Sequence, residues 1–231
     1  FRFYVALLSL DDGELIALLE GDAITGFRTS ATTLLAAAHL ARPDSLTLGL
    51  FGSGIQARAH ALAFASRPNL RKVRIHSHDA SGAQALASDI ERDHGLAAEV
   101  TDARSAASSD LVVLATRASM PVIRGAWLSE GAFVASIGAT RPDQREMDDA
   151  SLRRASRIVV DWTGQTPHET GDLCMPTQTW LASSALIDLS TVISADEHRN
   201  AGATDIVIYK AVGIALQDAA VAYLAYLRLI A

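Results

Sequence analysis

Residues 46–57 read Leu46-Thr47-Leu48-Gly49-Leu50-Phe51-Gly52-Ser53-Gly54-Ile55-Gln56-Ala57. An apolar run of strand length ends in Gly-x-Gly-x-x-Ala, and an Ala-rich helical segment follows at once. This order is typical of a dinucleotide-binding βα turn. Gly52 would allow a sharp turn, Gly54 has no Cβ to keep a diphosphate from the backbone, and Ala57 would let the helix pack closely on the strand. The alternative reading is a purely structural turn.

The chain after this turn alternates between strand-like and helical segments. The strand-like segments are residues 72–77, 97–101, 110–115, 132–137, 157–161 and 206–209. Asp79 or Ser81 is expected to cap a helix whose buried residues are Ala83, Leu86, Ala87 and Ile90. Because the strands are apolar enough for burial on both faces, we predict an α/β fold with a doubly wound parallel sheet.

The two ends of the chain differ from this pattern. Residues 1–10 and 14–19 flank Asp11-Asp12-Gly13, which indicates a hairpin. A helix should follow with Thr29 or Ser30 as N-cap and Leu34, Leu35 and Ala38 on its buried face, ending at Arg42-Pro43. Residues 212–229 form an apolar helix that should be buried between domains or subunits.

Composition limits the classes of function. The chain has 231 residues, a net charge of −6 and 49% hydrophobic residues, which suits one large globular domain or slightly more. The negative charge disfavours nucleic-acid binding, and no apolar run reaches the length of a membrane span. The single cysteine, Cys174, is compatible with a reducing cytoplasm. Since the chain opens inside an apolar run without Met, we expect a further N-terminal portion in the native protein.

Several polar residues occupy positions where ligands bind in such folds. Arg28 lies one residue before the expected helix start, where a guanidinium could bind a carboxylate or phosphate or simply form a surface ion pair. Thr116 and Thr140 follow strands whose carboxyl ends face the ligand crevice, although each could be a plain strand cap.

The end of the second strand bears on the choice of cofactor. Ser77 stands where NAD-specific folds place an acid that binds the ribose hydroxyls, and His78 follows it. Neither repels a 2′-phosphate, so NADP(H) is mildly favoured over NAD(H). His76, Ser77 and His78 do not indicate a metal site, because alternate strand residues face opposite sides.

Other titratable residues are assigned less specific roles. Asp143, Glu146, Asp148 and Asp149 resemble a solvated cluster that caps a helix. Asp218, in the apolar C-terminal helix, would need a partner if buried, and Lys210 could be that partner or a cofactor contact.

The sequence resembles the ornithine cyclodeaminase/μ-crystallin family over nearly its whole length. The matching motifs run in family order: Ile24-Thr25 with Arg28-Thr29, residues 48–57, Ala115-Thr116, Pro121-Val122-Ile123, Gly138-Ala139-Thr140-Arg141-Pro142-Asp143, Arg145-Glu146-Met147, Gly171-Asp172, and Tyr209-Lys210-Ala211-Val212-Gly213 with Asp218. The resemblance implies a Rossmann domain, residues 31–207, and a smaller substrate and dimerisation domain made from residues 1–30 and 208–231. It also implies a homodimer.

The resemblance also implies roles for individual residues. Arg28 would bind the substrate carboxylate, with Val212 lining the site, and the following residues would contact the cofactor: Thr29, Gly54, Ile55, Gln56, Ser77, His78 and Thr116. Gly52 and Lys210 are further cofactor-binding candidates, on the arguments from the glycine turn and from the titratable residues given above. Cyclodeaminases carry an Asp at the position of Thr140, and threonine cannot ionise there. Thr140 is therefore a candidate catalytic position that departs from the cyclodeaminase pattern, and residues 138–147 are closer to the μ-crystallin and ketimine reductase branch.

The combined prediction is a cytoplasmic NAD(P)H-dependent oxidoreductase that reduces a small imino acid or oxidises the matching amino acid. Two alternatives stay open. One is a cyclodeaminase that uses bound NAD and releases ammonia, and the other is a non-catalytic protein that binds NADP(H) and a small ligand. The predicted partners include neither a metal, a nucleic acid nor a membrane.

Overall fold

The computed structural model describes residues 3–175, 186–195 and 202–230. Its centre is a parallel sheet of eight strands, with the order β5-β4-β3-β6-β7-β10-β8-β9. These strands are β5 (Ala97–Val100), β4 (Lys72–His76), β3 (Thr47–Phe51), β6 (Leu111–Leu114), β7 (Phe133–Ser136), β10 (Ile206–Lys210), β8 (Ala155–Val160) and β9 (Leu186–Asp188). The predicted α/β fold with a doubly wound parallel sheet is confirmed.

The middle of the sheet is buried on both faces. Every residue of β6, β7 and β10 is buried, as expected for strands of mainly apolar sequence covered by helices on both sides. The chain order reverses between β3 and β6, because β4 and β5 lie on one side of β3 and β6 and β7 on the other. In open parallel sheets, ligands bind beyond the carboxyl ends of the strands at such a reversal.

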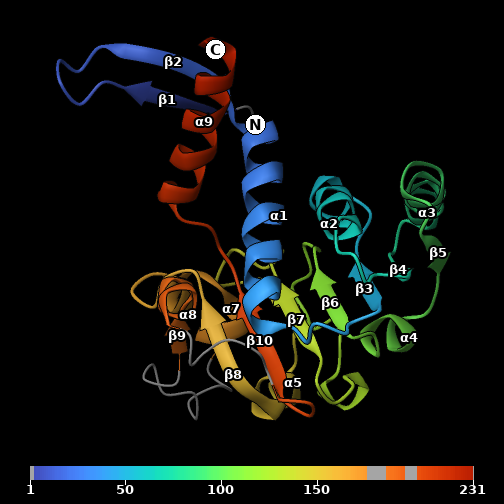
Figure 1. Ribbon diagram of the computed structural model, residues 1–231. Coiled ribbons are helices and arrows are strands. Elements are labelled where there is room, and N and C mark those ends of the chain that lie inside the picture. The colour runs from blue at the N-terminus through green and yellow to red at the C-terminus, as the bar shows by residue number, and fades with distance from the viewer. Residues whose placement is uncertain (1–2, 176–185, 196–201, 231) are drawn as a thin grey trace.

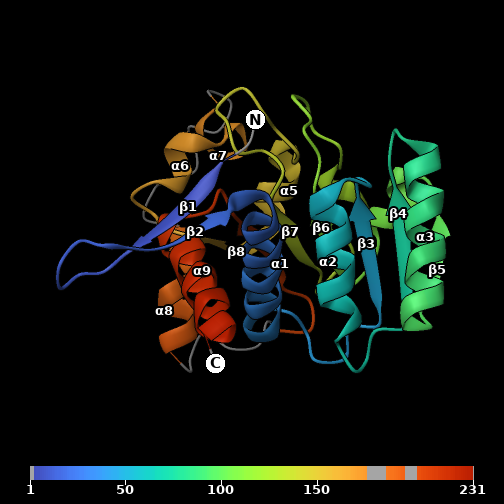
Figure 2. The same cartoon turned by 90° about the horizontal axis from the view of Figure 1, so that it is seen from above.

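Helices cover the sheet, and Figure 2 shows α1, α2 and α3 side by side along one face. The longer helices are α1 (Gly21–Leu40), α2 (Ile55–Ala65), α3 (Ala80–His94) and α9 (Ala215–Ile230), and the short ones are α4 (Ala103–Ala107), η1 (Gly125–Trp127), α5 (Asp149–Arg154), α6 (Thr166–Glu169), α7 (Gly171–Cys174) and α8 (Leu189–Ser194). Asp79 caps α3, which buries the four predicted residues Ala83, Leu86, Ala87 and Ile90.

The hairpin predicted at the N-terminus is present. β1 (Tyr4–Leu8) pairs antiparallel with β2 (Leu15–Glu20), and Gly13 in the connecting turn has a φ of 75°, which favours glycine. Figure 1 shows this hairpin projecting from the sheet together with α9 and the start of α1. The predicted domain boundaries at residues 30 and 208 fall inside α1 and β10, so we propose that the projecting part comprises β1, β2, the start of α1 and α9.

The predicted start of α1 at Thr29 or Ser30 is wrong, because the helix begins at Gly21. The Ser30 hydroxyl donates to the Gly26 carbonyl, 3.0 Å away, and therefore satisfies itself inside the helix instead of capping it. The predicted buried face is wrong for Leu35 and Ala38, which are exposed, whereas Leu34 is partly buried and packs against the core. The buried residues include Ile24, Thr33, Ala36, Ala37 and Leu40.

A buried histidine joins α1 to α2. The two ring nitrogens of His60 lie 2.7 Å from the Gln56 carbonyl and 3.0 Å from the Thr33 hydroxyl. Burial lowers the pKa of His60 to about 4, so the imidazole is neutral at physiological pH. This bridge fixes the first turn of α2 against α1.

The apolar helix α9 is not buried within this chain. Among its described residues only Ala222 is buried, while Leu216, Tyr223, Leu224, Leu227, Leu229 and Ile230 are exposed. The helix contacts α1 and β1, so most of its apolar surface remains uncovered in the single chain.

Candidate active site

Two clefts open along the carboxyl ends of the strands and meet between β3 and β6. The first, which we call the α1 cleft, has a volume of about 530 Å³ and is lined by Thr25, Arg28, Thr29, Gly54, Ile55, Gln56, Ala115, Thr116, Arg117, Ile137, Gly138, Thr140, Ala211, Val212 and Gly213. The second, the β4 cleft, has a volume of about 810 Å³ and is lined by Phe51, Gly52, Ser53, Gly54, His76, Ser77, His78, Asp79, Thr116, Arg117, Ala118, Ser119, Met120, Pro121 and Val122. The clefts share Gly54, Thr116 and Arg117.

The glycine turn after β3 lies where the two clefts meet. Gly52 has a φ of 103°, and a Cβ there would lie 2.5 Å from the Ala115 carbonyl oxygen. A Cβ on Gly54 would meet nothing within 4 Å, so the turn faces open space. Gly54 is the N-cap of α2 and provides no side-chain acceptor for the first backbone N–H groups of the helix. This turn therefore fits a bound diphosphate, which would accept from those donors.

At the end of β4, Ser77 and Asp79 are tied into the backbone of the turn. The hydroxyls of Ser53 and Ser77 are 3.1 Å apart, and the Asp79 amide donates to the Ser77 hydroxyl. One oxygen of Asp79 accepts from the Gly82 amide at 2.9 Å, and this contact holds the pKa of Asp79 below its usual range. His78 is exposed in the same cleft.

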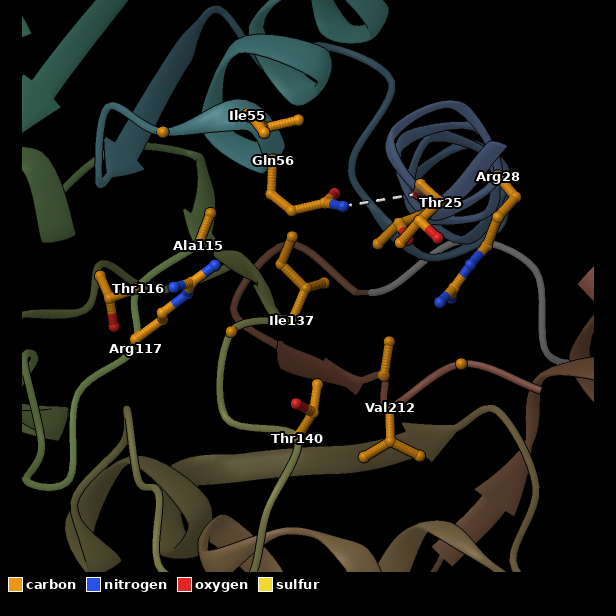
Figure 3. Close-up of a pocket in the computed structure, with 15 residues that line it drawn as sticks. Thr25, Arg28, Ile55, Gln56, Ala115, Thr116, Arg117, Ile137, Thr140 and Val212 are labelled. Atoms are coloured by element: carbon orange, nitrogen blue, oxygen red, sulfur yellow. Dashed lines mark hydrogen bonds between the residues drawn. The ribbon is translucent and has the colours of Figure 1, made fainter. Parts of the chain in front are cut away.

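Arg28 lies on the far wall of the α1 cleft, as Figure 3 shows. The prediction that it abuts a helix start is wrong, since it lies within α1. Its Nε donates to Asp218 at 3.2 Å and its Nη1 donates to Gln217 at 3.0 Å. A Cβ on Gly213 would lie 2.3 Å from Nη1, so only glycine allows this close approach. The 13% exposed side chain is thus held in one position with Nη2 unused by these contacts.

Asp161 directly follows β8 and accepts hydrogen bonds from the segment that precedes α9 and from Gln217 in α9. Its carboxylate accepts from the backbone amides of Val212 and Gly213, at 2.9 and 2.7 Å, and from Gln217 at 3.0 Å. The Tyr209 hydroxyl also donates to it, and burial raises the pKa of Tyr209 well above its usual range. Asp161 therefore fixes the backbone at Val212 and also orients Gln217, which accepts a hydrogen bond from Arg28. Asp161 is not among the residues predicted from the sequence, although an acid directly after an apolar strand is a visible signal.

Below the cleft, Glu146 connects the ends of β6 and β7. Its carboxylate accepts from the amide and hydroxyl of Thr116, both at 2.7 Å, and from the Gly138 amide at 2.9 Å. The prediction that Glu146 is solvated is wrong, because it is completely buried. Burial raises its pKa, while the Lys210 ammonium acts in the opposite direction. Asp148 caps α5, as predicted for this cluster.

Lys210 does not face either cleft, and this corrects its predicted role as a cofactor contact or partner of Asp218. The side chain is fully buried, and its Nζ lies 3.3 Å from Asp172 and 3.0 Å from the Ser136 hydroxyl. Asp172 also accepts from the amides of Glu146 and Met147, each at 2.9 Å. A buried ammonium needs such a counter-ion, so Lys210 supports the floor of the site from beneath.

The remaining predicted site residues gather around the α1 cleft. Figure 3 shows Thr140 and Val212 on one side, with Ile55 and Gln56 across from them. The Thr140 hydroxyl has no hydrogen bond to any residue that the structure describes. The Gln56 amide oxygen is buried and unpartnered within the same described ranges. Thr29 lines the cleft beside Arg28.

No group of three His, Cys, Asp or Glu side chains in residues 3–175, 186–195 and 202–230 could hold a metal ion. Over the same ranges, no helix is both long and apolar enough to span a membrane. Cys174 is exposed, with a free thiol.

Known proteins share the sequence pattern of this chain over nearly its whole length. The model of the ornithine cyclodeaminase/mu-crystallin family matches residues 2–231. The ketimine reductase mu-crystallin of Mus musculus is 30% identical over 96% of this chain and 68% of its own length.

Two solved structures are similar over almost the whole chain. The Δ1-pyrroline-2-carboxylate reductase of Thermococcus litoralis, in complex with NADH and L-proline, has a TM-score of 0.94 and 30% identity, covering 99% of this chain and 72% of that one. A probable ornithine cyclodeaminase from Bordetella pertussis Tohama I has a TM-score of 0.93 and 39% identity, covering 99% of this chain and 73% of that one.

Proposed function

The chain belongs to the ornithine cyclodeaminase/mu-crystallin family, and from this premise we propose that it is an oxidoreductase that uses a nicotinamide dinucleotide to reduce a small imino acid. The observation that carries the proposal is the pair of joined clefts, with a glycine turn at their junction and a fixed arginine on the far wall. A dinucleotide extends over two such clefts, and the arginine end is left for an acidic substrate.

The residues of this chain would bind and orient the reactants. The amides at the start of α2 and the open face of Gly54 would hold the diphosphate, while Ser77 and His78 would contact the adenosine ribose. Thr116, Thr29 and Val212 would line the nicotinamide end. A reduced nicotinamide, when bound, supplies a hydride to an imine carbon.

The substrate carboxylate would bind to Arg28. Asp218 and Gln217 engage its Nε and Nη1, so the guanidinium is already oriented before substrate arrives. A preoriented guanidinium binds a carboxylate with little loss of side-chain entropy. Thr140, across the cleft, can hydrogen-bond the substrate nitrogen but cannot carry a charge there.

The alternative activity is cyclodeamination of a diamino acid such as ornithine. The similarity to a probable ornithine cyclodeaminase favours it. The threonine at position 140 disfavours it, since the family resemblance implies an aspartate there in cyclodeaminases. Product assays distinguish the two: the reductase oxidises NADPH with a cyclic imino acid, whereas the cyclodeaminase releases ammonia without net use of cofactor.

For the cofactor, we propose a preference for NADP(H) over NAD(H). Ser77 offers a hydroxyl where an acid would repel a 2′-phosphate, and His78 adds a possible donor. Asp79 opposes this preference only in part, because one of its oxygens is engaged in capping α3.

Ser77→Asp should reverse the order of affinity. A carboxylate beside the 2′-phosphate would weaken NADPH by about tenfold or more, since like charges at contact distance cost on the order of a few kcal/mol. Fluorescence titrations of NADPH and NADH against both proteins measure this. Ser88→Asp adds the same charge on the exposed side of α3 and serves as control. A clear preference for NADH in the unmodified protein would refute the reading.

We further propose a homodimer in the cytoplasm. The α9 helix and the β1–β2 hairpin project together from the sheet in Figure 1, and both carry exposed apolar side chains that a second copy would cover. The free thiol of Cys174 suits a reducing compartment.

A further inference from the structure

We propose that Arg117 binds the diphosphate of the dinucleotide at the junction of the two clefts. The proposal rests on the proposed function, because it presumes that a nicotinamide dinucleotide occupies both clefts. The glycine turn has no charged side chain in residues 52–55, Gly-Ser-Gly-Ile. Arg117 would supply the positive charge that the diphosphate needs.

Arg117 lies where the two clefts meet. It follows β6 by three residues and lines both the α1 cleft and the β4 cleft. The only other residues common to both linings are Gly54 and Thr116. In a dinucleotide the diphosphate joins the adenosine half to the nicotinamide half. A molecule that fills both clefts must therefore place its diphosphate beside these three residues.

The Arg117 guanidinium is available for a ligand. It is exposed and, within the described residues, has neither a hydrogen bond nor an ion pair. Arg28, the other arginine of the α1 cleft, is engaged by Gln217 and Asp218. Figure 3 shows the Arg117 guanidinium beside Ala115, across the cleft from Arg28. Arg117 can therefore pair with an anion at the junction without giving up an existing partner.

The chemistry of the two walls fits a bound diphosphate. A guanidinium presents parallel N–H donors that match two phosphate oxygens, and it keeps its charge at every physiological pH. The uncapped N-terminus of α2 offers backbone donors from the glycine-turn side. Together they would bind a diphosphate from two directions, with the helix as a fixed donor and Arg117 as a mobile one.

The test is a set of binding titrations on Arg117→Gln and Arg117→Lys. The probes are NADPH, NADH, ADP-ribose, which keeps the diphosphate but lacks nicotinamide, and 2′-AMP, which has a 2′-phosphate but no diphosphate. Arg117→Gln should raise the Kd of NADPH, NADH and ADP-ribose by a similar factor of about tenfold and leave 2′-AMP unchanged. Arg117→Lys should fall between, because it keeps the charge but loses the paired donors.

The control is Arg104→Gln. Arg104 is an exposed arginine on α4 that lines neither cleft, so the change removes the same charge from the protein without altering the junction. The Kd of the dinucleotides should also depend less on salt in Arg117→Gln than in the unmodified protein, since one ionic contact is gone.

Three results would overturn the proposal. A loss of affinity confined to NADPH and 2′-AMP would assign Arg117 to the 2′-phosphate. A rise only in the KM of the imino acid would assign Arg117 to the substrate. Unchanged affinities for all four probes would leave Arg117 without a binding role. If the unmodified protein binds none of the dinucleotides, the proposed function itself fails, whatever Arg117 does.

Discussion

Replacing Arg28 with alanine should lower kcat/KM for the imino acid by about 30-fold or more, while the Kd of the dinucleotide stays nearly unchanged. A hydrogen bond to a charged group contributes about 1.5–3 kcal/mol, and Arg28 would supply the main cationic contact to the substrate carboxylate. The loss should appear chiefly in KM, because the carboxylate is bound alike in the ground state and the transition state.

Two controls separate a binding effect of Arg28→Ala from a loss of structure. Arg28→Ala leaves Asp218 and Gln217 without their partner, so thermal unfolding must show that the protein is intact. Arg28→Lys keeps the charge but loses the second donor group, and it should retain part of the affinity. Unchanged kinetics in a folded Arg28→Ala protein would remove Arg28 from the substrate site.

The second large effect concerns stability. Lys210→Met should lower the free energy of unfolding by about 3–5 kcal/mol at neutral pH, because it strands the buried carboxylates of Asp172 and Glu146 without their cation. Urea denaturation measures the change. Burial raises the pKa of Glu146, and the Lys210 charge that opposes this rise is gone in the variant, so the loss should shrink as the pH falls and Glu146 binds a proton.

The chain contains a matched control for this substitution. Its other lysine, Lys72, pairs with Glu99 at 2.8 Å on the surface, with the lysine side chain 36% exposed. Lys72→Met should therefore cost less than about 1 kcal/mol. The double variant Lys210→Met with Asp172→Asn should be more stable than Lys210→Met alone, since one stranded charge is gone. A loss from Lys210→Met no larger than that from Lys72→Met would contradict the buried-pair account.

The sequence predicted those parts of the fold whose signals are local. The glycine turn, the apolar strands and the helix capped by Asp79 each depend on residues within a few positions of one another, and the structure has all three. The resemblance to the family, carried by motifs in order along the chain, also pointed to the correct family.

The wrong predictions concern residues whose surroundings are set by contacts with residues far away in the sequence. The start of α1 was misplaced because glycines and hydroxyl residues have low helix propensity, yet packing against α2 and α9 stabilises the helix from Gly21 onward. Glu146 was read as solvated because its sequence neighbours are acidic, whereas the fold surrounds it with Thr116, Gly138 and Ser136. Lys210 was placed at the cofactor because Asp172, its partner, is distant in sequence.

The most direct test of the proposed function is a product assay on the purified protein. Five- and six-membered cyclic imino acids are supplied with NADPH, and L-ornithine with NAD⁺ is run in parallel. Reductase activity predicts oxidation of one NADPH for each cyclic amino acid formed, with no useful release of ammonia from ornithine. Release of ammonia and formation of proline from ornithine, with NAD⁺ regenerated and no NADPH oxidised by any imino acid, would contradict it.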